Sequence, residues 1–243
     1  MDLLSRVFVI DSSGSMCSED RQPLADTPIS TRLRSTCNNR YGAVLSALYG
    51  FWHSREPAQS GSQTRQDAYS VVTFNRTPVT RVSNDFTSTT DQLIGQLISH
   101  RSSGGTNFNA ALAHAQELIQ ANWSSDRAPA LVFLSDGMCT LQDNSVHDLC
   151  RMCVQLGKPL ALYTVSFGPE TYSTSLRQMA NIAQSVYASA PRDAFTAARG
   201  NPCSHSNAIG SIQLAETFLD IANSLQKPRA SLIGQSSGRV ATI

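Results

Sequence analysis

The sequence has little charge, and neither sign is in excess. Charged residues make up 15% of the 243 residues, with 19 Lys and Arg side chains against 18 Asp and Glu. Nucleic acids and anionic membrane surfaces are usually bound through a basic patch, which this balance does not favour. No apolar run approaches the length that spans a bilayer. We therefore expect neither a nucleic-acid partner nor insertion into a membrane.

Signatures of common enzyme classes are also scarce. The phosphate-binding pattern GxxxxGK[ST] does not occur, and the five histidines lie in no recognisable triad context. A phosphotransferase with Asp11 as nucleophile would want a second carboxylate two positions on, where Ser13 stands. These observations favour a protein that is not an enzyme.

The six cysteines resemble no small disulfide framework, because they are scattered along the chain. Cys150 and Cys153 form a CxxC pattern, but no second pair stands at the spacing of a zinc site. Leu149, Cys153 and Leu156 share one face of a helical pattern, which predicts buried thiols. This cysteine usage favours the cytoplasm. Two glycosylation-type tripeptides, at 75–77 and 122–124, leave the compartment open.

Apolar strand-like runs alternate with helical patterns along the chain. Near-continuous runs of Val, Ile, Leu, Phe and Tyr predict strands that are covered on both faces, as in a parallel sheet. These runs lie at 6–10, 68–74, 130–135 and 160–167. The alternating stretch 78–83 predicts an antiparallel edge strand, and 185–190 a short final strand.

Between the strands, apolar residues recur at helical spacing. The expected helices lie at 39–54, 90–100, 107–121, 143–157, 173–184 and 212–226. In the last helix, Ile212, Ala215, Leu219 and Ala222 form one apolar stripe, which should face the core. This alternation predicts a Rossmann-like, doubly wound α/β fold. Its central sheet should be mainly parallel, with one antiparallel edge strand and helices on both faces.

The pattern predicts one domain over residues 1–227 and a linker-like tail over 228–243. A polar segment at 17–38 separates the first strand from the first helix more widely than a usual loop, so we interpret it as an insertion beside the site. Strand-like sequence begins almost at Met1, and we expect the domain to be one module of a larger protein.

Three oxygen-bearing side chains follow the first strand. The stretch "DSSGS" places Asp11, Ser13 and Ser15 on alternate positions, which extended geometry turns to one side. Gly14 lets the backbone bend without a Cβ clash. Carboxylate and hydroxyl oxygens are hard ligands that suit Mg²⁺ or Mn²⁺ rather than zinc. The stretch therefore predicts part of a divalent metal site.

Two distant stretches supply further oxygen ligands where the fold places a ligand crevice. "SSGGTNF" is a Gly-rich loop that opens a helix and carries Thr106, and "LVFLSDG" is a buried strand that exposes Asp136 before a glycine turn. Two carboxylates only balance a 2+ charge, which would leave the metal electrophilic and able to accept a carboxylate from another molecule.

DxSxS after a first strand, a Gly-Gly-Thr loop and a strand-ending Ser-Asp-Gly together resemble the von Willebrand factor A (vWA) domain family over residues 3–226. The resemblance implies a metal-ion-dependent adhesion site (MIDAS) at Asp11, Ser13, Ser15, Thr106 and Asp136. It also implies metal-dependent binding of a protein partner whose Asp or Glu completes the coordination.

Other interpretations of the same residues stay open. Asp11, Ser13 and Ser15 could form a capped turn, and Thr106 could cap the following helix. Asp136 could be a turn acid before Gly137. The chain could also be a metal-dependent hydrolase or phosphotransferase, or a structural scaffold domain that binds nothing through the motif.

Overall fold

We describe a computed structural model of the protein, covering residues 3–56, 67–168, 173–191 and 202–226. The described strands form one six-stranded sheet in the order β3-β2-β1-β4-β5-β6. The strands are β1 (Leu3–Asp11), β2 (Ala68–Phe74), β3 (Pro78–Asp85), β4 (Arg127–Ser135), β5 (Ala161–Phe167) and β6 (Ser204–Ala208). Neighbouring strands are parallel except β2 and β3, which are antiparallel. The predicted fold class, with its antiparallel edge strand, is confirmed.

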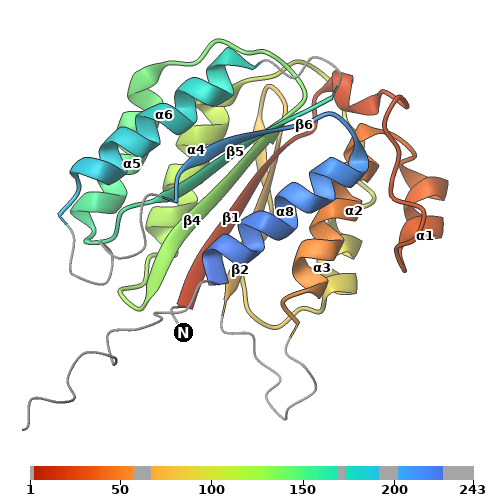
Figure 1. Ribbon diagram of the computed structural model, residues 1–243, viewed down its shortest axis with the longest axis horizontal. Coiled ribbons are helices and arrows are strands. Elements are labelled where there is room, and N and C mark those ends of the chain that lie inside the picture. Colours follow the sequence, from red (N-terminus) through yellow and green to blue (C-terminus); the bar gives the residue numbers. More distant parts are fainter. Residues whose placement is uncertain (1–2, 57–66, 169–172, 192–201, 227–243) are drawn as a thin grey trace, which may run out of the picture.

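Helices cover both faces of the sheet (Figure 1). One face carries α1 (Ser30–Thr36), α2 (Arg40–His53), α3 (Thr90–Leu97) and α8 (Ser211–Gln226). The other face carries α4 (Phe108–Ala121), α5 (Asp143–Gln155) and α6 (Thr174–Ser189). Each face buries its own hydrophobic cluster, so the domain has three layers.

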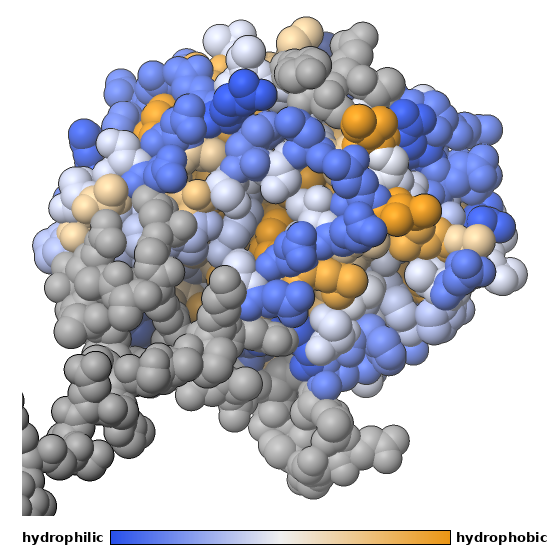
Figure 2. All heavy atoms as spheres, in the orientation of Figure 1, coloured by the Kyte–Doolittle hydropathy of each residue, from blue (hydrophilic) through white to orange (hydrophobic). Residues whose placement is uncertain are grey.

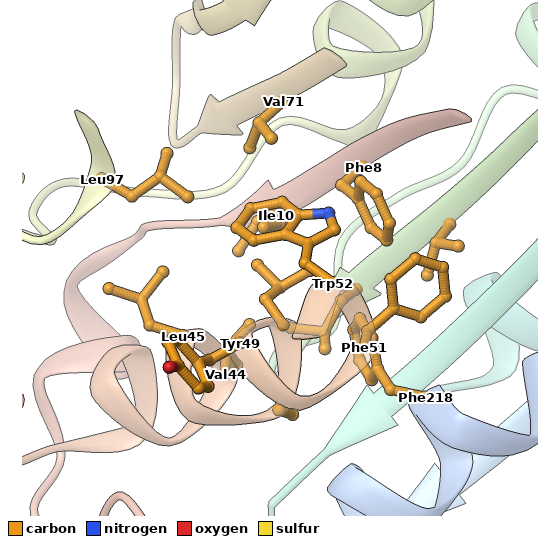
Figure 3. Packing of buried hydrophobic residues seen from close by; sticks show 14 of the residues in the cluster. Phe8, Ile10, Val44, Leu45, Tyr49, Phe51, Trp52, Val71, Leu97 and Phe218 are labelled. Carbon is orange, nitrogen blue, oxygen red and sulfur yellow. The ribbon is translucent and has the colours of Figure 1, made fainter. Parts of the chain in front are cut away.

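The central strand β1 explains why the sheet has two cores. Successive side chains of a strand point to opposite faces. Phe8 and Ile10 accordingly pack into the cluster under α2 and α8, while Val7 and Val9 pack into the cluster under α4. Figure 3 shows Phe8 beside aromatic rings from α2 and α8. Its ring centroid lies 5.1 Å from that of Phe51 in an edge-to-face arrangement, a favourable aromatic geometry.

The strand predicted at 185–190 is wrong, because α6 continues to Ser189. Val186 and Tyr187 favour a strand by composition, but Tyr187 continues the buried helical stripe of Met179 and Ala183. The sixth strand is instead β6, whose sequence "SHSNA" is polar and gives no hydrophobic signal. It forms at the edge of the sheet through its pairing with β5.

The prediction of which α8 residues face the core is also wrong. Leu214, Phe218 and Ile221 are buried against the sheet, whereas Ile212 is 69% exposed and Leu219 41% exposed. Only part of the predicted stripe packs inward, namely Ala222 and, less completely, Ala215. Figure 2, which views this side of the molecule, shows hydrophobic side chains as separate patches among hydrophilic ones.

The cysteine prediction is confirmed for the thiols and wrong for Leu156. Cys150 and Cys153 are buried in α5 as free thiols, but Leu156 is 38% exposed at the end of that helix. Burial raises the pKa of the Cys153 thiol to about 12 and that of Cys203 to about 11. Removal of these thiols from water disfavours the thiolate, so they are inert packing groups at neutral pH.

The 17–38 segment lies beside the end of β1 and is more ordered than an exposed loop. It contains α1, whose Leu33 is fully buried, and Ile29 just before it is also buried. The backbone of Arg40 donates to Ser18 O, which ties the start of the segment to the start of α2. The tail at 228–243 lies outside the described residues. Within the described residues, no helix is both long enough and apolar enough to cross a membrane.

An ion pair at the opposite end of the sheet was not anticipated from the sequence. Arg6 is only 1% exposed, and its Nη2 lies 2.9 Å from Asp67 Oδ2. Arg55 donates to the same carboxylate oxygen from Nη2, at 2.7 Å. Burial lowers the pKa of Arg6 to about 10, an effect that the nearby Asp67 charge partly offsets. Asp67 therefore compensates a buried cation.

We predict that Asp67→Ala lowers the free energy of unfolding by about 3–5 kcal/mol, because it leaves the Arg6 guanidinium buried without its carboxylate. Urea denaturation followed by circular dichroism measures this. Asp148→Ala, an exposed acid on α5, is the matched control and should change the value by less than about 0.5 kcal/mol. Equal effects of the two substitutions would contradict a compensating role for Asp67.

Candidate metal centre

The strand order reverses between β1 and β4, and this reversal fixes where a site can form. Both strands are parallel neighbours, with Ile10 opposite Leu134. Beyond its end, β1 leads to α2 on one face, while β4 leads to α5 on the other. Doubly wound sheets bind ligands at this reversal, outside the carboxyl ends of the strands, and we call this place the crevice. Asp11 is the last residue of β1, and Asp136 directly follows β4.

The Asp11 carboxylate is fully buried and joins these two strand ends. Its Oδ2 accepts a hydrogen bond of 2.5 Å from Ser135 Oγ, and its Oδ1 accepts one of 2.8 Å from the backbone N of Ser13. Burial raises the pKa of Asp11 to about 6, while the hydrogen bonds from Ser135 and Ser13 oppose this rise and the Asp136 charge adds to it.

Ser13, Ser15 and Asp136 form a hydrogen-bonded chain across the crevice. Ser15 Oγ donates to Asp136 Oδ1 at 2.7 Å, and the Ser13 and Ser15 oxygens are 3.0 Å apart. Because a hydroxyl has one proton, the Ser13–Ser15 hydrogen bond takes its proton from Ser13. The Ser13 hydroxyl also lies within hydrogen-bond reach of Asp11, and with either acceptor lone pairs of both hydroxyl oxygens stay available to a cation.

The three residues of the DxSxS motif meet, but not through the extended geometry expected from the sequence. The strand ends at Asp11, and Gly14–Cys17 forms the short 3-10 helix η1. This turn, rather than strand alternation, brings Ser15 back toward Ser13. Ser12 serves the fold instead, because its N and Oγ both donate to Phe74 O.

The loop that carries Thr106 is held against this turn by backbone contacts. Gly14 N donates to Gly104 O at 2.9 Å, and a Cβ added to Gly14 would lie 3.3 Å from that oxygen. Gly104 has a φ of +76°, which favours glycine. Gly14 thus permits the close approach of the two loops, a role that the sequence had not indicated.

Thr106 itself is not joined to the other four residues by a hydrogen bond. Within the described residues, its hydroxyl has no hydrogen-bond partner. Capping of α4 is done by Asn107, whose side chain accepts from Ala110 N, so the alternative role of Thr106 as a cap is wrong. Its backbone O accepts a weak 3.4 Å contact from Cys139 Sγ, which places its loop beside the one that follows Asp136. Its hydroxyl is free for a ligand.

Sequence reasoning missed two residues of this site. Ser135 links Asp11 to the loop after β4, because it also accepts from Gly137 N. Its signal was a hydroxyl at the end of an otherwise apolar strand. Arg40, the first residue of α2, donates from Nη1 to Asp136 Oδ2 at 2.7 Å. No sequence pattern pointed to Arg40, because the 17–38 segment separates it from the motif.

The donor set fits a hard divalent cation. Among the described residues, no cluster of three or more His, Cys, Asp or Glu side chains could hold a metal, so a site here depends on the serine and threonine hydroxyls. Four of the five described histidines contact polar groups elsewhere; His100 contacts Arg81, for example, and His205 contacts Thr164. Two carboxylates and free hydroxyl lone pairs suit Mg²⁺ or Mn²⁺.

The fold is a doubly wound α/β domain. Hydroxyl and carboxylate side chains that could bind a metal lie where its strand order reverses. A family model described as "von Willebrand factor type A domain" matches residues 6–138. The chain belongs to this family, whose domains are typically interaction modules and generally non-catalytic. A comparison with curated proteins finds no match.

Solved structures share the fold at low sequence identity. A von Willebrand factor type A protein from Catenulispora acidiphila has a TM-score of 0.62 and 15% identity, over 93% of this chain and 44% of that one. Proximal thread matrix protein 1 from the mussel byssus, with a zinc-occupied MIDAS motif, has a TM-score of 0.58 and 14% identity, over 94% and 48%. The SpRpn10 VWA domain has a TM-score of 0.57 and 12% identity, over 93% and 96%.

This chain spans about half the length of the first structures that it matches. The activities of those whole proteins therefore do not transfer to it directly.

We predict that Ser135→Ala lowers the free energy of unfolding by about 1.5–3 kcal/mol, because it removes a hydrogen bond to a buried carboxylate. Chemical denaturation in the presence of a chelator measures the loss without any contribution from metal. In an Asp11→Asn background the same substitution should cost clearly less, since the charged acceptor is gone. Equal costs in both backgrounds would mean that Ser135 does not act through Asp11.

Proposed function

We propose that the domain binds Mg²⁺ or Mn²⁺ through Asp11, Ser13, Ser15, Thr106 and Asp136, and a protein partner that presents an Asp or Glu. The observation that carries this proposal is the hydrogen-bonded chain of Ser13, Ser15 and Asp136, in which Ser15 donates to Asp136. In this chain the hydroxyl groups donate their protons to acceptors, so oxygen lone pairs remain available for a cation. A capped turn would not require this arrangement.

The residues would act in two groups. Ser13, Ser15 and Thr106 supply hydroxyl oxygens, and the two carboxylates supply charge and orient the hydroxyls. Asp11 and Asp136 would coordinate directly or through water. When bound, the metal supplies an electrophilic position that a carboxylate from another molecule can occupy. The partner itself would then be selected by the surface around the crevice.

The enzymatic alternatives lack support from the same geometry. A hydrolase or phosphotransferase would need a general base within hydrogen-bond reach of its nucleophile. Among the described residues, no histidine or lysine contacts Asp11, Ser13 or Ser15, and the carboxylate that Ser15 does contact, Asp136, is paired with Arg40. An interaction module, one part of a larger protein, fits the site better.

We predict that Thr106→Ala raises the Kd for Mn²⁺ at least tenfold, because it removes one ligand. Calorimetric titration into chelator-treated protein measures this. The fold should be unaffected, since the Thr106 hydroxyl bonds nothing within the described residues. Thr140→Ala, an exposed threonine on the loop after Asp136, is the control and should bind like wild type. The proposal is overturned if Thr106→Ala and Asp11→Asn leave metal binding unchanged. It is also overturned if wild-type protein binds no metal.

The open coordination position makes a second prediction. Acetate serves as the probe for a partner carboxylate, and acetamide as its uncharged counterpart. Acetate added to the Mn²⁺-loaded protein should lower the water proton relaxation rate, because it replaces a metal-bound water. Acetamide at the same ionic strength should have little effect, and Asp11→Asn protein should show no response beyond that of free Mn²⁺. Equal responses to both probes would argue against a carboxylate-binding position.

A further inference from the structure

A chain of charged side chains connects Asp136 to the 17–38 segment. Arg40 donates from Nη1 to Asp136 Oδ2 at 2.7 Å, and from Nε and Nη2 to the two oxygens of Asp20 at 2.7 and 2.8 Å. The Asp136 side chain is fully buried, that of Arg40 is 13% exposed and that of Asp20 31% exposed. The guanidinium thus lies between a carboxylate of the candidate metal centre and one from the insertion.

The position of Arg40 is fixed from several directions. Asn39 caps α2 by accepting from Gly42 N, and the backbone N of Arg40 donates to Ser18 O. The guanidinium also packs over Gly168 at the end of β5, where an added Cβ would lie 3.5 Å from Cζ. Hydrogen bonds between Asp20 and Arg40 lower the pKa of Asp20 to about 2 and raise that of Arg40. Both groups are therefore charged at neutral pH.

These contacts set the charge that a cation would meet in the crevice. Arg40 places a positive charge directly on Asp136, which opposes a metal ion there. Asp20 offsets that charge through a bidentate pair, a strong geometry for arginine and carboxylate. Arg21 also approaches Asp20, with its Nη1 3.6 Å from Asp20 Oδ2, so the three carboxylates, Asp11 included, outweigh the two guanidinium groups by one charge. The group as a whole therefore stays anionic toward a cation.

We propose that Arg40 and Asp20 are positioning residues that set the metal affinity of the crevice in opposite directions. Arg40 holds one oxygen of Asp136 and weakens cation binding, whereas Asp20 offsets Arg40 and strengthens it. This inference rests on the metal site proposed above. By linkage, a partner that draws Asp20 away from Arg40 lowers the affinity for the metal. The insertion therefore regulates metal binding at the site.

The test is a double-mutant cycle of Mn²⁺ affinity, measured by calorimetry on chelator-treated protein. Asp20→Asn should raise the Kd about tenfold, and Arg40→Met should lower it about tenfold. This is the size that Coulomb's law gives for one charge facing a divalent ion a few ångströms away in a water-like dielectric. The double variant should bind within about threefold of wild type.

Thermal unfolding in chelator supplies a second readout. Each single substitution breaks the same ion pair, so both should lower Tm in the same direction while the metal affinities move apart. Asp26→Asn and Arg34→Met make the same charge changes at exposed positions of the insertion and serve as controls. They should leave the Kd within about threefold of wild type.

The outcomes separate this inference from the proposed function. The inference alone is overturned if wild-type protein binds Mn²⁺ and Asp11→Asn abolishes this binding, but the Asp20 and Arg40 variants shift the Kd in the same direction or not at all. Wild-type protein that binds no Mn²⁺ overturns the proposed function and the inference with it. Opposite shifts with a near-normal double variant support both.

Discussion

The buried carboxylate of Asp11 is the constraint on which the crevice depends. It stands at the end of the central strand, without exposure to solvent, and accepts hydrogen bonds from Ser13 and Ser135. Those two contacts fix the turn after β1 and the end of β4 relative to each other. A buried carboxylate is costly unless it is satisfied, so the two segments must keep these positions for the fold to be stable. The geometry around Ser15 and Asp136 follows from that arrangement.

Charge in the crevice is shared among segments that are distant in the sequence. The first strand and the loop after β4 contribute acids, the insertion contributes Asp20, and the first residue of α2 contributes Arg40. In the proposed site, hydroxyl lone pairs and nearly balanced charge would hold a cation without enclosing it. This balance would suit a module that takes its last ligand from a partner, and the proposal gives the insertion a role in the site.

Low identity to the solved structures shows how little of the sequence the fold requires. The matched structures share 12–15% identity over nearly all of this chain, and yet have the same sheet and helix layers. The order of apolar strands and amphipathic helices is enough to specify such layers. The Arg40 contact adds a feature to this frame that the order of strands and helices does not specify.

The sequence by itself determined the fold class and the four buried strands, because continuous apolar runs and helical periodicity are local signals. It also pointed to Asp11, Ser13, Ser15 and Asp136, which hydrogen bonds link near the strand ends, since parallel strands bring their carboxyl ends to one edge. Tertiary structure alone decided the rest. Pairing with β5 makes a strand of the polar "SHSNA" stretch, and packing turns Phe218 rather than Leu219 inward. The 3-10 turn at Ser15 and the contacts of Ser135 and Arg40 join residues far apart in the chain, and no local pattern encodes such contacts.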